Sequence, residues 1–222
     1  LYEQEVDART PRTSFFNCLK NSAQQFYFRP KEDDAYLLAG YPWFKVRARD
    51  LFVALPGCTL SIADPVRFEK IMHTAMPAVR AYMAENKPDA VIREIDEPDV
   101  FLWAIWAIQQ YAREAGLERA KELYGEFVNE ILEFISGQKH PDMKVMENGL
   151  LFANGRDKAI TWMNSTINGK PVVPRSGYIV EFNALWYNAL CFYTELMGGV
   201  PIEKYDKLIK AMDISFQETF VN

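Results

Sequence analysis

Charged and amide side chains stand where three apolar segments begin, with Arg49 and Asp50 before the first and Asp99 at the second. Glu181 and Asn183 open the third. A carboxylate at a helix N-terminus is stabilised in its ionised form by the helix dipole. Ionised carboxylates and arginines grouped around aromatic rings are the usual means of holding a polyhydroxylated ligand. Asp99 and Glu181 could equally be simple helix caps, but the recurrence of the pattern at three helix starts favours a site.

Two tryptophans near these positions, Trp43 and Trp162, fall in segments with polar neighbours. A sugar ring presents C–H faces that pack on an aromatic ring, while its hydroxyls need charged or amide partners. Trp103 and Trp106 lie in an apolar run and are predicted to be core residues, as most aromatic residues are. Trp43 and Trp162 are therefore the predicted ligand contacts.

The elements that must position these side chains are helices with two kinds of apolar pattern. One kind carries a single apolar stripe and buries one side. Such a helix begins at Asp64, an N-cap residue followed by Pro65 at the first helical position. Another runs from about residue 117 to 137, a third follows Pro201, and a weaker stripe covers residues 16–26.

The second kind of helix is apolar on nearly every face and covers residues 51–60, 100–108 and 182–192. A helix that is apolar all round must be surrounded by other structure. The two kinds alternate along the chain, as expected of an α/α toroid, in which parallel inner helices bring their N-termini to one mouth. Three inner helices make half of a six-hairpin ring. We therefore expect residues 1–222 to be the N-terminal portion of one toroidal domain, with an open apolar edge available for self-association.

Residues from about 139 to 180 interrupt the helical pattern. Asn154-Gly155 and Asn168-Gly169 are turn signals beside short strand-like pieces at residues 149–152 and 171–173. A loop of this length in a compact helical domain is usually functional. The sequence thus predicts an all-α fold with a loop and short-strand insertion at 139–180.

Composition argues against several classes of function. The chain is 49% hydrophobic and 14% aromatic, which indicates a globular protein, and its net charge of -5 offers no basic field for nucleic acid. Two histidines, without CxxC or HExxH spacing, predict no metal site. The longest nearly uninterrupted apolar run, Val100–Ile108, is too short to cross a bilayer. Three separated cysteines in apolar stretches predict reduced, buried thiols, and we expect a cytoplasmic protein.

Several blocks of the sequence together carry a family resemblance. In chain order the blocks are Ala39–Phe44 (AGYPWF), Arg49-Asp50, Ala54–Gly57 (ALPG), Asp99 with Leu102-Trp103, Thr161–Asn164 (TWMN), Pro174–Gly177 (PRSG) and Val180–Leu190 (VEFNALWYNAL). From about Tyr36 onward, this order resembles the C-terminal amylo-α-1,6-glucosidase domain of glycogen debranching enzymes, a six-hairpin glycosidase.

The resemblance implies an (α/α)6 toroid that removes the α-1,6-linked glucose from branched α-glucans such as glycogen or limit dextrin, with inversion and without a cofactor. Inversion uses one carboxylic acid to protonate the leaving oxygen and a second carboxylate, about 6.5–9.5 Å away, to activate water. By this resemblance Arg49 and Asp50 would hold the terminal glucose, and Trp162 would line its subsite. Three further residues would support the loop or contact sugar hydroxyls: Arg175, Glu181 and Asn183.

Two departures from the family pattern bear on catalysis. The family's proton donor is the Asp of a TWMD motif, whereas this sequence has Asn164, and an amide cannot deliver a proton. The family's general base belongs to a later part of the domain, so we expect this polypeptide alone to be inactive. The alternatives are a non-catalytic toroid that binds α-glucan and a helical scaffold, which would have no need of charges at an inner mouth.

Overall fold

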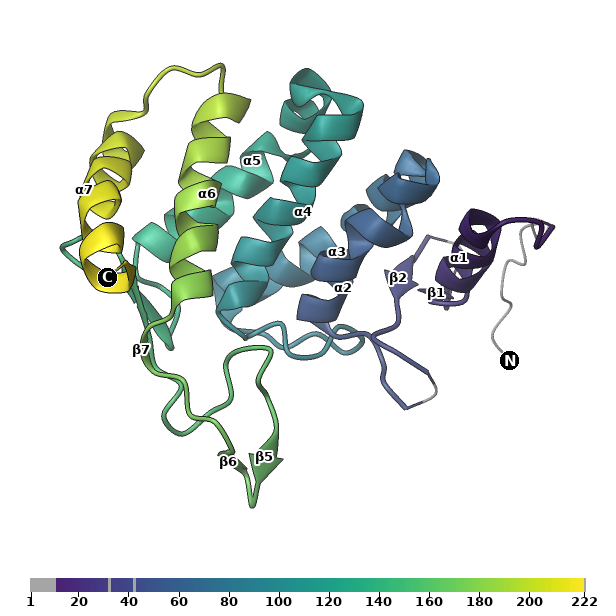
Figure 1. Cartoon of the computed structure of the whole chain (residues 1–222), viewed down its shortest axis with the longest axis horizontal. Coiled ribbons are helices and arrows are strands. Elements are labelled where there is room, and N and C mark those ends of the chain that lie inside the picture. The colour runs from purple at the N-terminus through teal and green to yellow at the C-terminus, as the bar shows by residue number, and fades with distance from the viewer. Residues whose placement is uncertain (1–10, 32, 42, 222) are drawn as a thin grey trace. The chain divides into compact units, whose positions relative to one another are not determined.

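The structure is a computed structural model, and it describes residues 11–31, 33–41 and 43–221. Those residues form seven α-helices and a few short strands (Figure 1). The chain divides into two compact units, Leu1–Asp96 and Glu97–Asn222, which are described separately. The all-α class predicted from helical periodicity is confirmed.

The first unit combines three α-helices with a small strand pair. Helix α1 (Phe15–Gln24) leads into strands β1 (Tyr27–Phe28) and β2 (Tyr36–Leu37), which pair antiparallel. Helix α2 (Ala48–Cys58), a short 3-10 turn η1 (Leu60–Ile62) and helix α3 (Pro65–Glu85) follow.

The predicted start of α3 is confirmed in atomic detail. The Asp64 side chain accepts a hydrogen bond from the Arg67 backbone N–H at 3.0 Å, and Pro65 occupies the first turn. Pro77 lies inside this helix without ending it. The helix stops at Asn86, whose φ of 53° is the left-handed conformation common at helix C-termini. The local signals at both ends are therefore sufficient to fix this element.

Four helices build the second unit: α4 (Asp99–Ala115), α5 (Leu117–Ser136), α6 (Val180–Leu196) and α7 (Glu203–Phe220). Gly116, at φ 91°, turns the chain between α4 and α5 in a single residue. Helices α4 and α6 lie side by side, and α5 packs against both (Figure 1). The Gln109 and Asn188 amides exchange two hydrogen bonds of 3.2 and 2.9 Å between α4 and α6, which fixes their relative height. Helix α7 packs on α6.

Burial distinguishes the three helices predicted to be surrounded on all sides. Helix α4 has ten buried residues from Asp99 to Ala112, with Trp103 and Trp106 half-buried. Helix α2 instead leaves Val53 40% exposed, and α6 leaves Ala184 exposed within the predicted range. The expectation therefore holds for α4 and is wrong for one side of α2 and of α6, where small and aliphatic residues face open space. Among the described residues no helix is both long and apolar enough to cross a membrane.

Two further sequence expectations need correction. Helix α1 exposes its apolar Phe15 and Phe16, at 79% and 54%, and it ends before Phe26. Its stripe is therefore not a buried one. The thiols are free but half-buried rather than buried: Cys18, Cys58 and Cys191.

The segment between α5 and α6 holds the strands expected within residues 139–180. Strands β3 (Met143–Val145), β4 (Leu151–Ala153) and β7 (Gly177–Tyr178) form an antiparallel sheet with β4 in the centre. Strands β5 (Thr166–Ile167) and β6 (Lys170–Pro171) form a separate hairpin. Because β7 is followed directly by α6, this segment lies at the N-terminal end of that helix (Figure 1).

Gly149 joins the β3–β4 turn to α7. Its φ is 82°, and a Cβ there would stand 2.9 Å from Met212 Cγ and 3.1 Å from the Leu208 carbonyl oxygen. Its own carbonyl accepts a hydrogen bond from the Trp186 indole at 3.3 Å. The turn can contact both helices only because this residue has no side chain.

We expect Gly149→Ala to lower the free energy of unfolding by about 3 kcal/mol, because left-handed strain and overpacking add. Gly169→Ala is the matched control: φ is 77° but nothing lies within 4 Å of the added Cβ, so strain alone acts and the cost is about 1–2 kcal/mol. Urea denaturation measures both. Equal losses would show that the contact with α7 adds nothing.

Candidate functional site

The predicted site residues divide between the two units. Trp43, Arg49 and Asp50 belong to the first unit. The second unit holds the other six: Asp99, Trp162, Asn164, Arg175, Glu181 and Asn183. A grouping of Asp50 with the second set stays a prediction.

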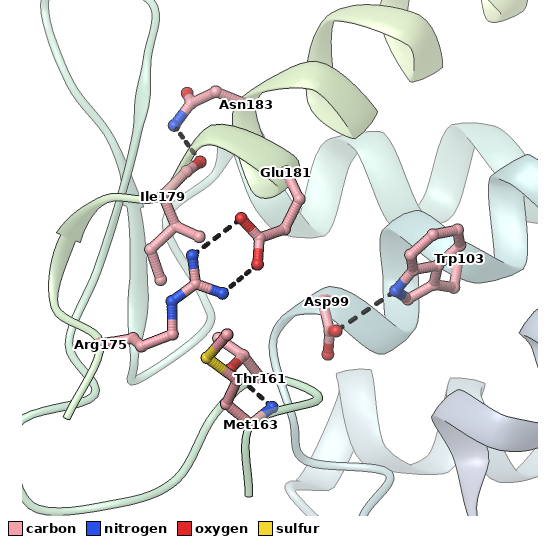
Figure 2. Close-up of polar contacts among 8 residues, drawn as sticks. All are labelled: Asp99, Trp103, Thr161, Met163, Arg175, Ile179, Glu181 and Asn183. Atoms are coloured by element: carbon pink, nitrogen blue, oxygen red, sulfur yellow. Dashed lines mark hydrogen bonds and ion pairs between the residues drawn. The ribbon is translucent and has the colours of Figure 1, made fainter. Parts of the chain in front are cut away.

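An ion pair between Arg175 and Glu181 occupies the start of α6. Both terminal nitrogens of the Arg175 guanidinium, Nη1 and Nη2, donate hydrogen bonds to the Glu181 carboxylate, and the Nη2 to Oε2 distance is 2.9 Å (Figure 2). Both side chains are largely buried, with 22% and 29% of their surface exposed. Glu181 lies in the first helical turn while Ile179 is the N-cap, so Glu181 does not cap the helix. A two-point contact of this kind fixes the orientation of Arg175 as well as its position.

The charge of Glu181 is settled by the same contact. Burial raises the pKa of the carboxyl, but hydrogen bonds from Arg175 and Trp162 and the positive charge of Arg175 together outweigh it, and the pKa of Glu181 lies below its ordinary value. Glu181 is therefore ionised at neutral pH. A general acid needs the opposite, a raised pKa, so this carboxylate is poorly suited to donate a proton.

Asp99 occupies the first turn of α4 and is almost fully buried, at 2% exposed. Its Oδ2 accepts a hydrogen bond of 3.2 Å from the Trp103 indole. The N-cap of α4 is Pro98, so capping does not explain Asp99 either. Figure 2 shows Asp99 and the Arg175–Glu181 pair at the same end of α4 and α6. The starts of α4 and α6 thus place these two carboxyl side chains at one end of the helix pair.

A hydrogen bond between residues two positions apart shapes the loop that carries Trp162 and Asn164. The Thr161 hydroxyl, in a residue only 1% exposed, accepts from the Met163 backbone N–H at 3.2 Å. This turn directs Trp162 outward, where 62% of it is exposed, yet its side chain is near enough to Glu181 to contribute to lowering the pKa of that carboxyl. Asn164 follows as a half-buried residue. The exposed indole therefore stands beside a fixed ion pair.

The base of this loop closes where Gly155 meets the backbone of Arg175. A Cβ on Gly155 would lie 2.1 Å from the Arg175 carbonyl oxygen and 2.7 Å from Ile160 Cγ1, so only glycine fits. Sequence reasoning took Asn154-Gly155 as a turn signal and missed this approach, because it depends on residues up to 20 positions away. Thr161 was noted only as part of a motif. A threonine hydroxyl commonly accepts a hydrogen bond from the backbone N–H two residues later, and that pattern was the signal that could have predicted this turn.

The Asn183 side chain is hydrogen-bonded inside the protein. Its Oδ1 accepts from the Leu151 N–H at 2.7 Å, and its Nδ2 donates to the carbonyls of Leu151 and Ile179 at 3.0 Å each. The residue is 0% exposed. The resemblance allows two roles for Asn183, support of the loop or contact with sugar. Its geometry favours support, because the amide ties β4 to the first turn of α6.

In the first unit, the three predicted residues differ in exposure. Trp43 is 81% exposed, Arg49 is buried at 7%, and Asp50 lies exposed in the first turn of α2. The neighbouring Arg47 pairs with Glu94 at 2.9 Å. An exposed indole and a carboxylate at a helix start therefore recur here.

The second unit presents an aromatic face, a fixed guanidinium and ionised carboxylate oxygens, all held before any ligand arrives. Such an arrangement suits a polyhydroxylated ligand, because binding would require little reordering. Asn164 and the paired Glu181 are both unable to supply a proton readily. No group of three or more histidine, cysteine or acidic residues that could hold a metal ion is found among the described residues.

We expect Glu181→Gln to lower the free energy of unfolding at pH 7 by about 1–3 kcal/mol, because it removes charge-assisted bonds to a largely buried arginine. Since the folded-state pKa is depressed, the contribution of the pair is complete above the ordinary value of 4.5 and is lost as the pH falls through the folded-state pKa. Urea unfolding from pH 7 to pH 3 should show the two proteins converging.

The control for that series is Glu203→Gln, which removes an exposed pair with Lys207 on α7. Its effect should stay below about 0.5 kcal/mol at every pH. A constant difference between wild type and Glu181→Gln down to pH 3 would contradict the assigned charge.

Comparison with known proteins identifies one family. A family model described as amylo-alpha-1,6-glucosidase matches residues 20–222. No curated protein and no solved structure matches the chain. The matched region includes the second unit, most of the first and all the candidate site residues, and the chain therefore belongs to the amylo-α-1,6-glucosidase family of glycogen-debranching-type glycoside hydrolases.

Proposed function

We propose that the protein acts on branched α-glucans such as glycogen or limit dextrin. The proposed reaction is removal of the α-1,6-linked glucose with inversion. The observation that carries this proposal is the exposed Trp162 indole, on the loop whose far end is tied to α6 by the Arg175–Glu181 pair. A glucose ring could pack on the indole while its hydroxyls meet the carboxylate oxygens and the guanidinium. Family membership supplies the substrate class.

The proposed architecture is part of an (α/α)6 toroid. Its support is the second unit, where α4 and α6 lie side by side and α5 packs on both. In the proposal, α4 and α6 are two inner helices of the ring and α5 is an outer one. In the proposal, Trp43, Arg49 and Asp50 of the first unit hold the terminal glucose.

The proposal assigns different tasks to the residues of the second unit. Trp162 contacts the sugar. Arg175 and Glu181 keep the loop closed, and Asn183 holds β4 behind it. Asp99 lies in the first turn of α4, almost fully buried and bonded to the Trp103 indole, and the proposal leaves it as a reserve carboxyl group.

A second candidate function is a glucan-binding protein without hydrolytic activity. Asn164 favours it, because an amide at the family's general-acid position retains the shape of the side chain and loses the proton. The ionised state of Glu181 favours it as well, since the adjacent carboxylate cannot take over the task readily. Asp99 is the remaining candidate for a substitute donor.

Asn164→Asp should raise hydrolysis of the α-1,6 stub by about 10²–10⁴-fold in the full-length protein, since a positioned general acid contributes that much. Asn168→Asp makes the same chemical change in the exposed β5–β6 turn and should leave the rate unchanged. The measurement is glucose release from a branched dextrin across a pH series.

Strong wild-type activity that Asn164→Asp does not alter would show that the proton comes from elsewhere. In that case Asp99→Asn should abolish the activity if Asp99 is the donor. Absence of glucose release in all variants, combined with retained glucan affinity, would favour the binding protein over the enzyme.

Trp162→Ala should weaken binding to glycogen about five- to tenfold, because the stacking face is lost. Val172→Ala, in the same loop and 51% exposed, is the control and should bind as wild type does. Affinity electrophoresis in glycogen-containing gels gives both values. An unchanged affinity of Trp162→Ala would remove the indole from the proposed site.

A further inference from the structure

The first unit contains a cavity that the proposed glucan site does not use. Its volume is about 450 Å³, which falls in the range typical of small-molecule pockets. Four aromatic residues and two cationic ones contribute to its lining: Tyr27, Phe28, Tyr41, Phe44, Lys45 and Arg93. Trp43, Arg49 and Asp50 are not among the lining residues.

The hydroxyls of the two tyrosines are already committed to the protein. Tyr27 donates to the Cys58 carbonyl, and Tyr41 donates to the Gln25 carbonyl. The aromatic lining therefore offers ring surface and few hydroxyl donors to a ligand. A neutral polyhydroxylated sugar needs many polar partners, so this cavity suits it poorly.

The charged part of the lining has one sign. Lys45 and Arg93 both line the cavity, and none of the other described lining residues carries a carboxylate. In the part of the chain that the structure describes, neither side chain has an ion-pair or hydrogen-bond partner. Lys45 and Arg93 are both exposed residues, so a ligand can reach their side chains.

Two further arginines stack on the rings of the lining from beside the cavity. The Arg67 guanidinium carbon lies 4.0 Å from the centre of the Tyr27 ring, and that of Arg47 lies 5.4 Å from the centre of the Phe44 ring. Their carboxylate partners, Asp64 and Glu94, hold them there. The cavity thus combines flat apolar walls with cationic side chains.

We propose that this cavity binds a small anion with a flat aromatic ring, of the nucleoside monophosphate class. The base packs against the aromatic walls, and the phosphate bonds Lys45 and Arg93, as cationic donors bond phosphate elsewhere. The site is separate in its residues from the proposed glucan site, and the two can be tested independently.

The backbone around Arg93 allows its side chain to be changed safely. Its N–H donates to the Val46 carbonyl at 3.0 Å, and its carbonyl accepts from the Ala48 N–H at 2.9 Å. Those bonds do not involve the guanidinium. Arg93→Gln and Lys45→Gln should therefore fold normally, and circular dichroism confirms this before any titration.

The experiment is calorimetric titration of the full chain with adenosine 5′-monophosphate, adenosine, inorganic phosphate and maltotetraose. We expect the monophosphate to bind and each charge variant to weaken it about tenfold, the usual effect of losing one charge-assisted bond. Phe44→Leu, which retains apolar volume and removes the ring, should weaken it too. Lys87→Gln, an exposed lysine of the same unit outside the lining, should have no effect.

Three results would overturn the proposal. The first is no binding of the monophosphate at millimolar concentration. The second is an equal loss in Lys87→Gln, which would indicate only a general attraction of anions. The third is displacement of the monophosphate by maltotetraose, which would assign the cavity to neutral glucan. None of these outcomes depends on glucose release or on Trp162.

Discussion

The pairing of Arg175 with Glu181 is the constraint on which the candidate site of the second unit depends. It joins the end of a long loop to the first turn of α6, and both partners are largely withdrawn from water. A single unpaired charge in that position would be costly, because burial penalises it without compensation. The loop therefore has one favourable closed arrangement. Trp162 belongs to the same loop, and its side chain contributes to the lowered pKa of the same carboxyl.

Three contacts of different kinds support the pair. Asn183 fixes the start of α6 to β4 through a fully buried amide. Gly155 permits the loop backbone to close on Arg175. Thr161 shapes the turn that exposes the tryptophan. Hydrogen bonds to the backbone and close backbone packing thus hold the site together, and the ion pair fixes the orientation of the Arg175 side chain. Such construction leaves little conformational entropy for a ligand to remove on binding.

Sequence reasoning recovered what local patterns determine. The start of α3 at Asp64 follows from a capping side chain and a proline, and the burial of α4 follows from its uniformly apolar surface. The burial of α2 and α6 was overestimated, because apolar composition shows what could be covered and not what covers it. The role of Asn183 and the approach of Gly155 to Arg175 were not predictable, since both depend on backbone brought together from distant positions. Strands β1 and β2 were missed because two-residue strands carry no periodicity.

The loop between β4 and β7 has a tip of a different character from its base. The base closes tightly at Gly155, whereas the Asn168-Gly169 tip in the β5–β6 hairpin is exposed, with Ile167 66% exposed beside it. Exposed tips tolerate insertions and deletions, because lengthening a loop adds little to its closure entropy. Relatives could therefore diverge in the length and composition of this hairpin while the base of the loop kept its backbone contacts. The tip is where natural variation, or a protein engineer, could change the loop without rebuilding the domain.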